Sequence, residues 1–333
     1  MSSSFSESLP DNLWEWHAGA AVVHIISCLV LAFVTEFQWS SDFPGTVGPV
    51  TYTYTLDNGA ATNASQSNST NPTWSVGAQV EQEWVYANPV TGVAVNEGLT
   101  AASHIVGAVL ARIAPNAMYE SRRRWLEYSV TAGILEICLL LAYGVRDWFA
   151  LLLVFALNAA LQLGGGAQLD ALRRAKGNAA SDVYAEQKIW LLFQSFLFLF
   201  VQIFYTVTMA ATSAASAAVF ASSVTYAVFY ASFGVLQTCS HCSDTFDEWF
   251  DTSNAFCLLS VTSKLCLSYH IVLVGKQIEN GGGNVQDTVD GLNAGVIVLY
   301  VVSGLAAVLY TVVQCNKRDD NTSSQGAFGT RRA

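Results

Sequence analysis

Long runs of apolar residues recur along the chain, and their length constrains its fold more than any other feature. A helix needs about 20 mostly apolar residues to cross a bilayer. Only 12% of the residues are charged, about half of the share that is usual in soluble proteins. We therefore predict an all-α integral membrane protein. The apolar runs cover residues 18–36, 98–113, 118–143, 147–166, 189–211, 215–238, 254–275 and 291–314.

The first seven runs are predicted to pack as one seven-helix transmembrane bundle, residues 18–278. The eighth run, 291–314, is an additional transmembrane helix behind a linker rich in Gly and Asn. Its small residues permit close contact with another helix, so it is a candidate for pairing with a second copy of the chain. The other predicted regions are the N-terminal tail 1–17, the loop 37–98 within the bundle, the linker 279–290 and the C-terminal tail 315–333.

Lysine and arginine are unevenly distributed between the loops, and this asymmetry predicts the orientation of the chain. When the chain is threaded through eight spans with its N-terminus inside, most of the 15 Lys and Arg residues fall on the inner side. Only Arg146 and Lys276 fall outside, and Lys264 lies within a span. Cytoplasmic loops of membrane proteins carry an excess of these residues. We therefore predict that both termini are cytoplasmic.

The polar segment 37–98 then faces outward. Residues 50–56 and 80–87 are rich in β-branched and aromatic side chains, and a stretch rich in Asn, Ser and Gly separates them. This pattern is typical of two strands joined by a loop, so we expect a small β-ribbon over the outer surface. Asn63 and Asn68 begin Asn-X-Ser/Thr sequons and are candidate glycosylation sites.

One cation lies deep inside an apolar run. Lys264 stands in the middle of 254–275, with apolar or small residues for several turns on both sides. Its side chain cannot reach the interface across that length of helix. A buried amine needs an anionic partner, and a lysine amine can also form a Schiff base with an aldehyde. The residues alone leave two interpretations open: a Schiff base with a buried counterion, or a structural ion pair in a transporter-like bundle.

The third apolar run supplies a matching anion. Glu127 lies at a similar depth to Lys264 when 118–143 is helical, and we expect the two side chains to pair. Arg124 precedes Glu127 by three residues and shares its helix face, so it is predicted as a second cation beside Glu127. Glu136 follows Glu127 by nine residues, on nearly the opposite face. Arg124 and Glu136 are therefore the candidates for an ion path away from the Lys264 site.

The sequence favours neither an enzyme nor a nucleic-acid-binding protein. It shows no nucleophile–base set and no phosphate-binding loop, and its net charge of −10 is opposite to that of phosphate-binding domains. Cys239 and Cys242 flank His241, but a closed zinc site needs four ligands and no second pair lies nearby. We therefore predict no metal site. The acidic run at 244–251 is a candidate docking face for an unidentified signalling partner inside the cell.

Several of these motifs resemble heliorhodopsins. RWLEYS in the third run, LLLVFALNAAL in the fourth and LSVTSKLCLSY in the seventh are similar to sequences of that family. The resemblance covers residues 12–278 and implies a seven-helix retinal protein with an inside N-terminus, in agreement with the orientation derived from the charges. Tyr269 and His270 depart from it, because they stand where a Trp–Gln-like pair is expected.

The resemblance assigns the roles around the amine. It implies that Lys264 carries all-trans retinal as a Schiff base, that Glu127 is the counterion, and that Ser260, one turn before Lys264, hydrogen-bonds near the Schiff base.

Further roles concern the proton and the pocket. The resemblance implies that His24 and His104 form a proton-accepting cluster in a polar inner cavity and that Asn158 lines the retinal pocket. Aromatic side chains at helical spacing in the sixth run favour an apolar slot, and Tyr226 and Phe229 are its candidate walls.

The function predicted from these features is that of a light receptor. Photoisomerisation would deprotonate the Schiff base and drive a slow signalling change. Two alternatives remain. Glu136 and the histidines motivate light-activated proton transport or channel activity. A plain Lys264–Glu127 ion pair motivates a retinal-free transporter or scaffold in the lipid bilayer.

Overall fold

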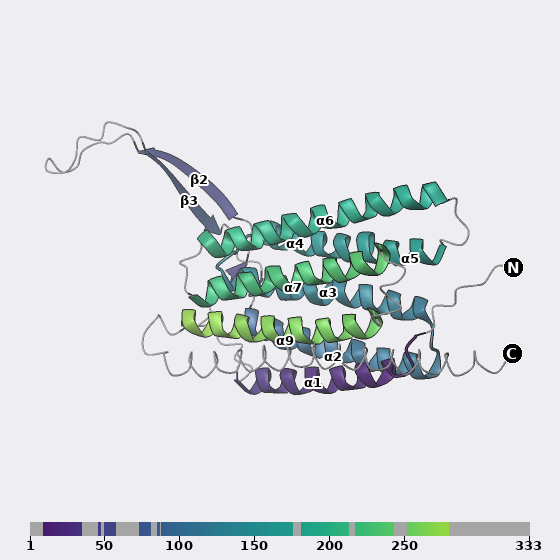
Figure 1. Ribbon diagram of the computed structural model, residues 1–333. Coiled ribbons are helices and arrows are strands. Elements are labelled where there is room, and N and C mark those ends of the chain that lie inside the picture. The colour runs from purple at the N-terminus through teal and green to yellow at the C-terminus, as the bar shows by residue number, and fades with distance from the viewer. Residues whose placement is uncertain are drawn as a thin grey trace, which may run out of the picture.

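Long helices that lie side by side form one bundle (Figure 1). The computed structural model describes residues 9–34, 46–47, 50–57, 73–80, 85–86, 88–175, 181–212, 217–242 and 252–279. The helices are α1 (Leu13–Val34), α2 (Pro89–Ile113), α3 (Ala117–Ala142), α4 (Trp148–Ala159), α5 (Gln168–Ala175), α6 (Ser181–Thr212), α7 (Ala217–Cys242) and α9 (Thr252–Glu279), with a π-helical segment η1 (Ala160–Ala167) between α4 and α5.

Six of the described helical segments are long and apolar enough to cross a membrane: Leu13–Phe33, Pro89–Ile113, Ala117–Ala142, Trp148–Leu172, Glu186–Ala211 and Thr252–Val274. Helix α7, predicted as a span, has 26 residues. It packs against α6 and α9 within the bundle. Large apolar side chains such as Phe33, Phe200 and Phe204 are exposed on the bundle surface, as expected for a surface that contacts lipid.

Helix α2 begins well before the predicted start at residue 98. The Asn88 side chain accepts hydrogen bonds from the backbone nitrogens of Val90 and Thr91, at 2.9 and 3.3 Å, and Pro89 occupies the first turn. Asn and Pro are both favoured at helix starts. The prediction of a loop over 37–98 is therefore wrong for its last ten residues, 89–98, which belong to α2. Polar residues in these first turns hide the helix from a hydropathy scan, because they face the bundle interior rather than lipid. The predicted tail 1–17 is likewise too long, since α1 begins at Leu13.

The glycines of η1 allow close packing around the interior. A Cβ atom on Gly165 would lie 2.2 Å from Ser195 Oγ of α6, and one on Gly166 would lie 2.5 Å from the Trp125 ring of α3. Real Cβ atoms essentially never approach other atoms so closely. A side chain at either position would have to displace its neighbour, so these glycines permit close packing where the fourth span meets α3 and α6.

The two long strands extend away from one end of the bundle (Figure 1). Strand β2 (Val50–Asp57) pairs antiparallel with β3 (Thr73–Val80), and the two-residue strands β1 (Thr46–Val47) and β4 (Val85–Tyr86) pair with each other. The expected second strand at 80–87 was therefore misplaced, because the partner of β2 is the segment just before it. The predicted helix 291–314, the tail 315–333 and the sequon residues Asn63 and Asn68 lie outside the described residues.

Candidate functional site

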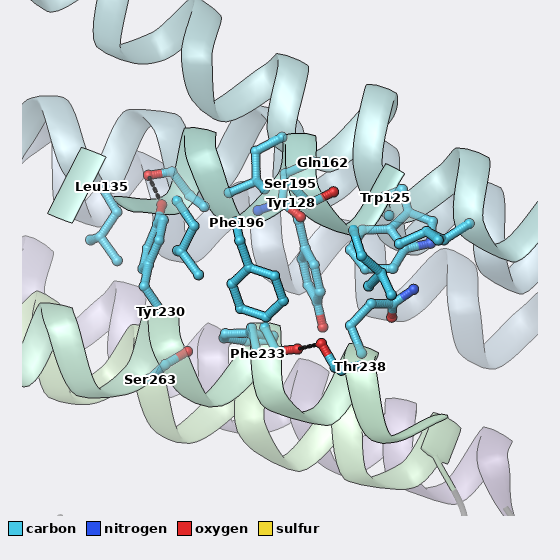
Figure 2. Close-up of a pocket in the computed structure, with 18 of the residues that line it drawn as sticks. Trp125, Tyr128, Leu135, Gln162, Ser195, Phe196, Tyr230, Phe233, Thr238 and Ser263 are labelled. Atoms are coloured by element: carbon cyan, nitrogen blue, oxygen red, sulfur yellow. Dashed lines mark hydrogen bonds between the residues drawn. The ribbon is translucent and has the colours of Figure 1, made fainter. Parts of the chain in front are cut away.

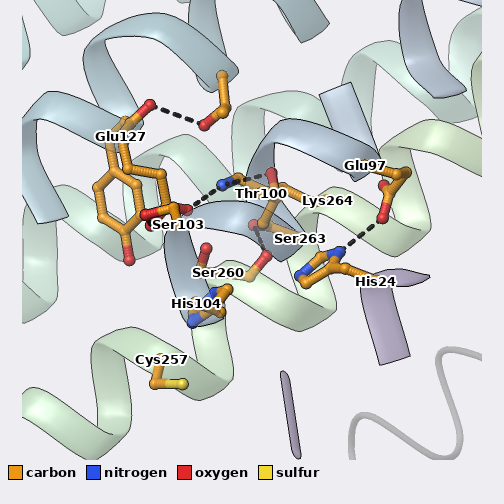
Figure 3. A network of polar contacts seen from close by, with 12 residues as sticks. His24, Glu97, Thr100, Ser103, His104, Glu127, Cys257, Ser260, Ser263 and Lys264 are labelled. Carbon is orange, nitrogen blue, oxygen red and sulfur yellow. Dashed lines mark hydrogen bonds and ion pairs between the residues drawn. The ribbon is translucent and has the colours of Figure 1, made fainter. Parts of the chain in front are cut away.

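Three helices meet at the amine of Lys264 (Figure 3). Helix α9 carries Lys264, whose side chain is buried. Its Nζ donates to Glu127 Oε1 of α3 at 2.5 Å and to Thr100 Oγ1 of α2 at 3.2 Å. Glu127 is itself buried. Two buried charges that pair and hydrogen-bond in this way compensate each other, whereas either alone would be strongly destabilising.

The second cation beside Glu127 is Arg123, and the prediction of Arg124 in that position is wrong. Arg123 Nη1 donates to Glu127 Oε2 at 2.7 Å, and Ser103 Oγ donates to the same oxygen at 2.8 Å. Arg124 Nη2 instead donates to Asp170 Oδ2 at 3.0 Å. Both arginines are close enough in sequence to reach Glu127, and the neighbouring helices decide which one does.

Arg123 also extends the polar network toward the start of α1. Its Nη2 and Nε atoms donate to the two carboxylate oxygens of Glu120 at 2.7 and 3.0 Å. Glu120 Oε2 lies 3.3 Å from His17 Nε2, and His17 Nδ1 lies 2.9 Å from His104 Nδ1. A continuous set of ionisable contacts therefore connects Lys264 with the second turn of α1.

The two predicted histidines belong to a larger cluster. The rings of His24 and His104 stack, with centroids 5.6 Å apart and an interplanar angle of 8°. His24 Nδ1 lies 2.5 Å from Glu97 Oε2, and Ser268 Oγ donates to Glu97 Oε1 at 2.5 Å. The sequence interpretation missed Glu97 and His17. A spacing of seven could have revealed them, because His17 precedes His24, and Glu97 precedes His104, by two helical turns on the same face.

An apolar pocket opens beside Lys264 (Figure 2). It lies between α3, η1, α6, α7 and α9, and its lining combines aliphatic with aromatic side chains. The aromatic side chains are Trp125, Tyr128, Phe196, Tyr230 and Phe233. Lys264 and its neighbour Ser263 supply polar atoms at the α9 side.

The predicted walls on α7 were displaced by about one turn. Tyr226 and Phe229 are absent from the pocket lining, whereas Tyr230 and Phe233 of the same helix form part of it. The hydroxyl of Tyr226 instead donates to Glu136 at 2.6 Å. The aromatic spacing marked α7 as a packed helix, but its rotation and depth relative to α3 decide which rings border the pocket.

Asn158 lies behind the wall rather than in it. This fully buried residue is absent from the pocket lining. Its Nδ2 atom donates to the backbone oxygens of Tyr128 and Ser129 at 3.2 and 3.1 Å, and its Oδ1 atom accepts from the Tyr230 hydroxyl at 3.3 Å. Asn158 therefore connects α4 with two helices that border the pocket. Ser260 is buried on α9, one turn before Lys264.

Glu136 occupies a separate polar cluster. Besides Tyr226, it accepts from Thr206 Oγ1 at 3.2 Å and from Gln202 Nε2 at 3.1 Å, both on α6. All of these side chains are buried. Glu136 thus points toward α6 and α7, away from the Lys264 network.

A buried acceptor, Asp170 of α5, lies where the pocket meets one end of the bundle. It gathers donors from α3 and α7, and the sequence interpretation missed it. Its contacts are Trp125 Nε1 at 2.7 Å, Ser121 Oγ at 2.7 Å, Arg124 Nη2 at 3.0 Å, Gln237 Nε2 at 3.2 Å and His241 Nε2 at 3.4 Å. His241, noted above between two cysteines, therefore has a carboxylate partner.

Comparison with known families agrees with this geometry. The family model for heliorhodopsin matches residues 13–275, which run from the first residue of α1 into the last turns of α9. The chain belongs to the heliorhodopsin family. Membership of this family, together with the long apolar helices, makes the chain an integral, multi-pass membrane protein. It also places the chain among the retinal-binding, light-sensing rhodopsins. Both statements agree with the prediction from the sequence. Comparison with curated proteins gave no match.

The residues present fit retinal, the cofactor that the family implies. Retinal is a long apolar polyene with an aldehyde, so it requires an amine that borders an apolar pocket. Lys264 borders such a pocket, and aromatic and aliphatic walls are typical of cofactor sites of this kind. Glu127 supplies the anion that a protonated Schiff-base nitrogen needs in a buried place.

Proposed function

We propose that this heliorhodopsin is a light receptor in which Lys264 Nζ is the attachment atom for all-trans retinal and Glu127 is the counterion. One observation carries the proposal: the Lys264 amine borders the apolar pocket and at the same time lies 2.5 Å from the buried Glu127 carboxylate. A plain structural ion pair would not require an aromatic pocket at the same amine.

Bound retinal would supply visible absorption and a double bond that isomerises on illumination. The protein side chains hold the charge at Nζ. Glu127 neutralises it and is placed to accept the single N–H of a protonated Schiff base. Thr100 accepts a hydrogen bond from the free amine, and the Tyr128 ring centroid lies 5.3 Å from Nζ, within range of a cation–π attraction. Arg123 in turn restricts Glu127 by binding its second oxygen.

The histidine cluster is suited to accept a proton from the Lys264 site. His104 Nε2 is buried and makes no hydrogen bond within the described residues, so no protein donor already occupies this nitrogen. His24 stacks on His104, and Glu97 beside it can balance an added positive charge. These contacts support proton transfer into the cluster on α1 and α2.

The wall of the pocket provides a route for a conformational signal. Trp125 borders the pocket with its ring and donates through Nε1 to Asp170. Asp170 also contacts Gln237 and His241 near the end of α7. A displacement of Trp125 would therefore alter the hydrogen bonds between α3, α5 and α7 at that end of the bundle. This arrangement supports a signalling role.

The orientation of the chain is part of the same proposal. The distribution of Lys and Arg supports cytoplasmic termini, which would direct the ends of α3, α5 and α7 near Asp170 toward the cytoplasm. A signalling partner that binds these helix ends would then be a cytoplasmic protein.

Light-driven proton movement is the alternative function, and the buried Glu136 cluster favours it. Against it, the small cavity beside Glu136 is lined largely by apolar side chains of α3 and α9, including Leu135, Leu139 and Leu267. Voltage-clamp recording during illumination distinguishes the two. A current that disappears in Glu136→Gln would replace the receptor proposal, whereas pigment formation without current at any potential supports it.

The attachment site is tested by adding all-trans retinal to the retinal-free protein. The wild type should gain a visible absorption band, and Lys264→Ala should not. Lys188→Ala is the matched control, because Lys188 lies on α6 and donates to the backbone oxygen of His241. A band that persists in Lys264→Ala would refute the attachment site, and its absence from the wild type would favour a retinal-free transporter.

A further inference from the structure

Three side chains of the kinds that bind transition metals converge between α1, α2 and α9. They are His17, His104 and Cys257, and one ligand atom from each lies within 4.8 Å of the others. His17 Nδ1 is 2.9 Å from His104 Nδ1 and 3.9 Å from Cys257 Sγ. All three are buried. Figure 3 shows His104 and Cys257 near each other, beside the Lys264 network.

The spacing of these atoms suits a zinc ion. Zinc binds imidazole nitrogen at about 2.0–2.1 Å and thiolate sulfur at about 2.3 Å in tetrahedral geometry. These bond lengths place two nitrogens about 3.3 Å apart, and a nitrogen and a sulfur about 3.6 Å apart. The two separations observed at His17 are therefore close to those required, and small rotations of the side chains would complete the geometry.

A carboxylate stands behind one of the histidines. Glu120 Oε2 lies 3.3 Å from His17 Nε2, on the opposite side of the ring from Nδ1. Histidines that bind metals commonly donate their second N–H to a carboxylate, which orients the ring and leaves the other nitrogen free for the metal. Glu120 is itself fixed by two hydrogen bonds from Arg123.

We propose that His17, His104 and Cys257 bind one Zn²⁺ through Nδ1, Nδ1 and Sγ, with a fourth position left for water. Binding would release the thiol proton of Cys257 to solvent and leave both imidazoles neutral, as metal binding requires. His17 and Cys257 each lie in the second turn of a helix, so the ion would enter from the end of the bundle where α1 and α9 begin. The sequence-based prediction of no metal site considered only Cys239, His241 and Cys242. None of these residues belongs to the site proposed here.

The site would couple a cation to the light-absorbing region. His104 is both a proposed ligand and the stacking partner of His24, so an ion bound at Nδ1 would add positive charge beside both rings and disfavour a proton at His104 Nε2. Zinc would thereby regulate proton transfer within the cluster. The binding itself is independent of retinal and is measured without it.

The test uses the purified, retinal-free full chain after chelator treatment and removal of any affinity tag. Equilibrium dialysis with ZnCl₂ should give one tightly bound ion per chain. Co²⁺ in place of Zn²⁺ should produce a sulfur-to-cobalt charge-transfer band and the intense visible bands of tetrahedral cobalt. This spectrum in the wild type needs no variant that could fail to fold. A cobalt spectrum without the thiolate band would overturn the proposal.

Variants then assign the ligands. Cys257→Ser should abolish the charge-transfer band and weaken zinc binding by at least about tenfold, and Glu120→Gln should weaken it by about 10–100-fold while keeping the band. Cys266→Ser is the control, because Cys266 is a buried cysteine of the same helix outside the cluster. Equal zinc binding by Cys257→Ser and Cys266→Ser would also refute the site.

Discussion

The guanidinium of Arg123 donates to Glu127 Oε2 at 2.7 Å, while Lys264 Nζ occupies the other carboxylate oxygen. One anion thus serves two buried cations. The adjacent Arg124 is directed to Asp170, with its guanidinium 4.3 Å from the Phe256 ring centroid. Two consecutive arginines therefore stabilise two different polar groups, one at the Lys264 amine and one at the end of the pocket.

Removing the charge of Glu127 should destabilise the retinal-free protein strongly. Glu127→Gln leaves Lys264 without its buried anion, and breaking a buried pair from one side costs about 3–5 kcal/mol. The double variant Glu127→Gln/Lys264→Met should be more stable than the single variant, because neither charge of the pair remains. Chemical unfolding in detergent measures both. A double variant less stable than Glu127→Gln would show that the pair does not dominate the stability here.

The two arginines should differ in their effect on colour. Arg123→Gln removes a cation that offsets the charge of Glu127, so the anion would stabilise a positive Nζ more strongly in the ground state. We expect the absorption maximum of the retinal-bound protein to move to shorter wavelength. Arg124→Gln serves as the control and should leave the maximum nearly unchanged, since its partner is Asp170. Equal shifts in the two variants would contradict this assignment.

The glycines of η1 should tolerate substitution unequally. A Cβ atom on Gly166 would lie 2.5 Å from the Trp125 ring, so Gly166→Ala should displace this wall of the pocket. We expect a loss of about 1–3 kcal/mol, as for other overpacked interiors, and a lower yield of retinal-bound protein. Gly164→Ala is the matched control, because its nearest contact would be 3.7 Å away at Gln194. Thermal unfolding and absorbance report the two effects.

Glu97 should control the rate of proton movement after a flash. Glu97→Gln removes the carboxylate that pairs with His24 and accepts from Ser268. A positive charge on the histidine cluster would lose its balancing anion, so proton transfer should slow by about tenfold or more, within the range for acid–base groups. Flash photolysis measures it. Glu15→Gln, which changes an exposed carboxylate of α1, should behave as the wild type, and an unchanged rate in Glu97→Gln would remove Glu97 from the cluster's function.

Membership of the heliorhodopsin family and the membrane-spanning character were predictable from the sequence, and the family match confirms both. The apolar runs are long and the charges few, so the bilayer is the only solvent that suits them. The depth of Lys264 and Glu127 along their helices also followed from counting residues, because the rise per residue is constant. Helix starts were less predictable, as at Asn88, where polar residues of α2 face the interior.

The sequence by itself determined which residues lie at the same depth and which share a helix face. It could not determine which neighbouring helix each face meets, because periodicity is a property of one helix while contact depends on how several rotate against each other. The tertiary structure therefore decided that Arg123 rather than Arg124 binds Glu127. It also decided that Tyr230 and Phe233 rather than Tyr226 and Phe229 border the pocket. For the same reason only the packed bundle brings His17, His104 and Cys257, which are far apart in the chain, within reach of one ion.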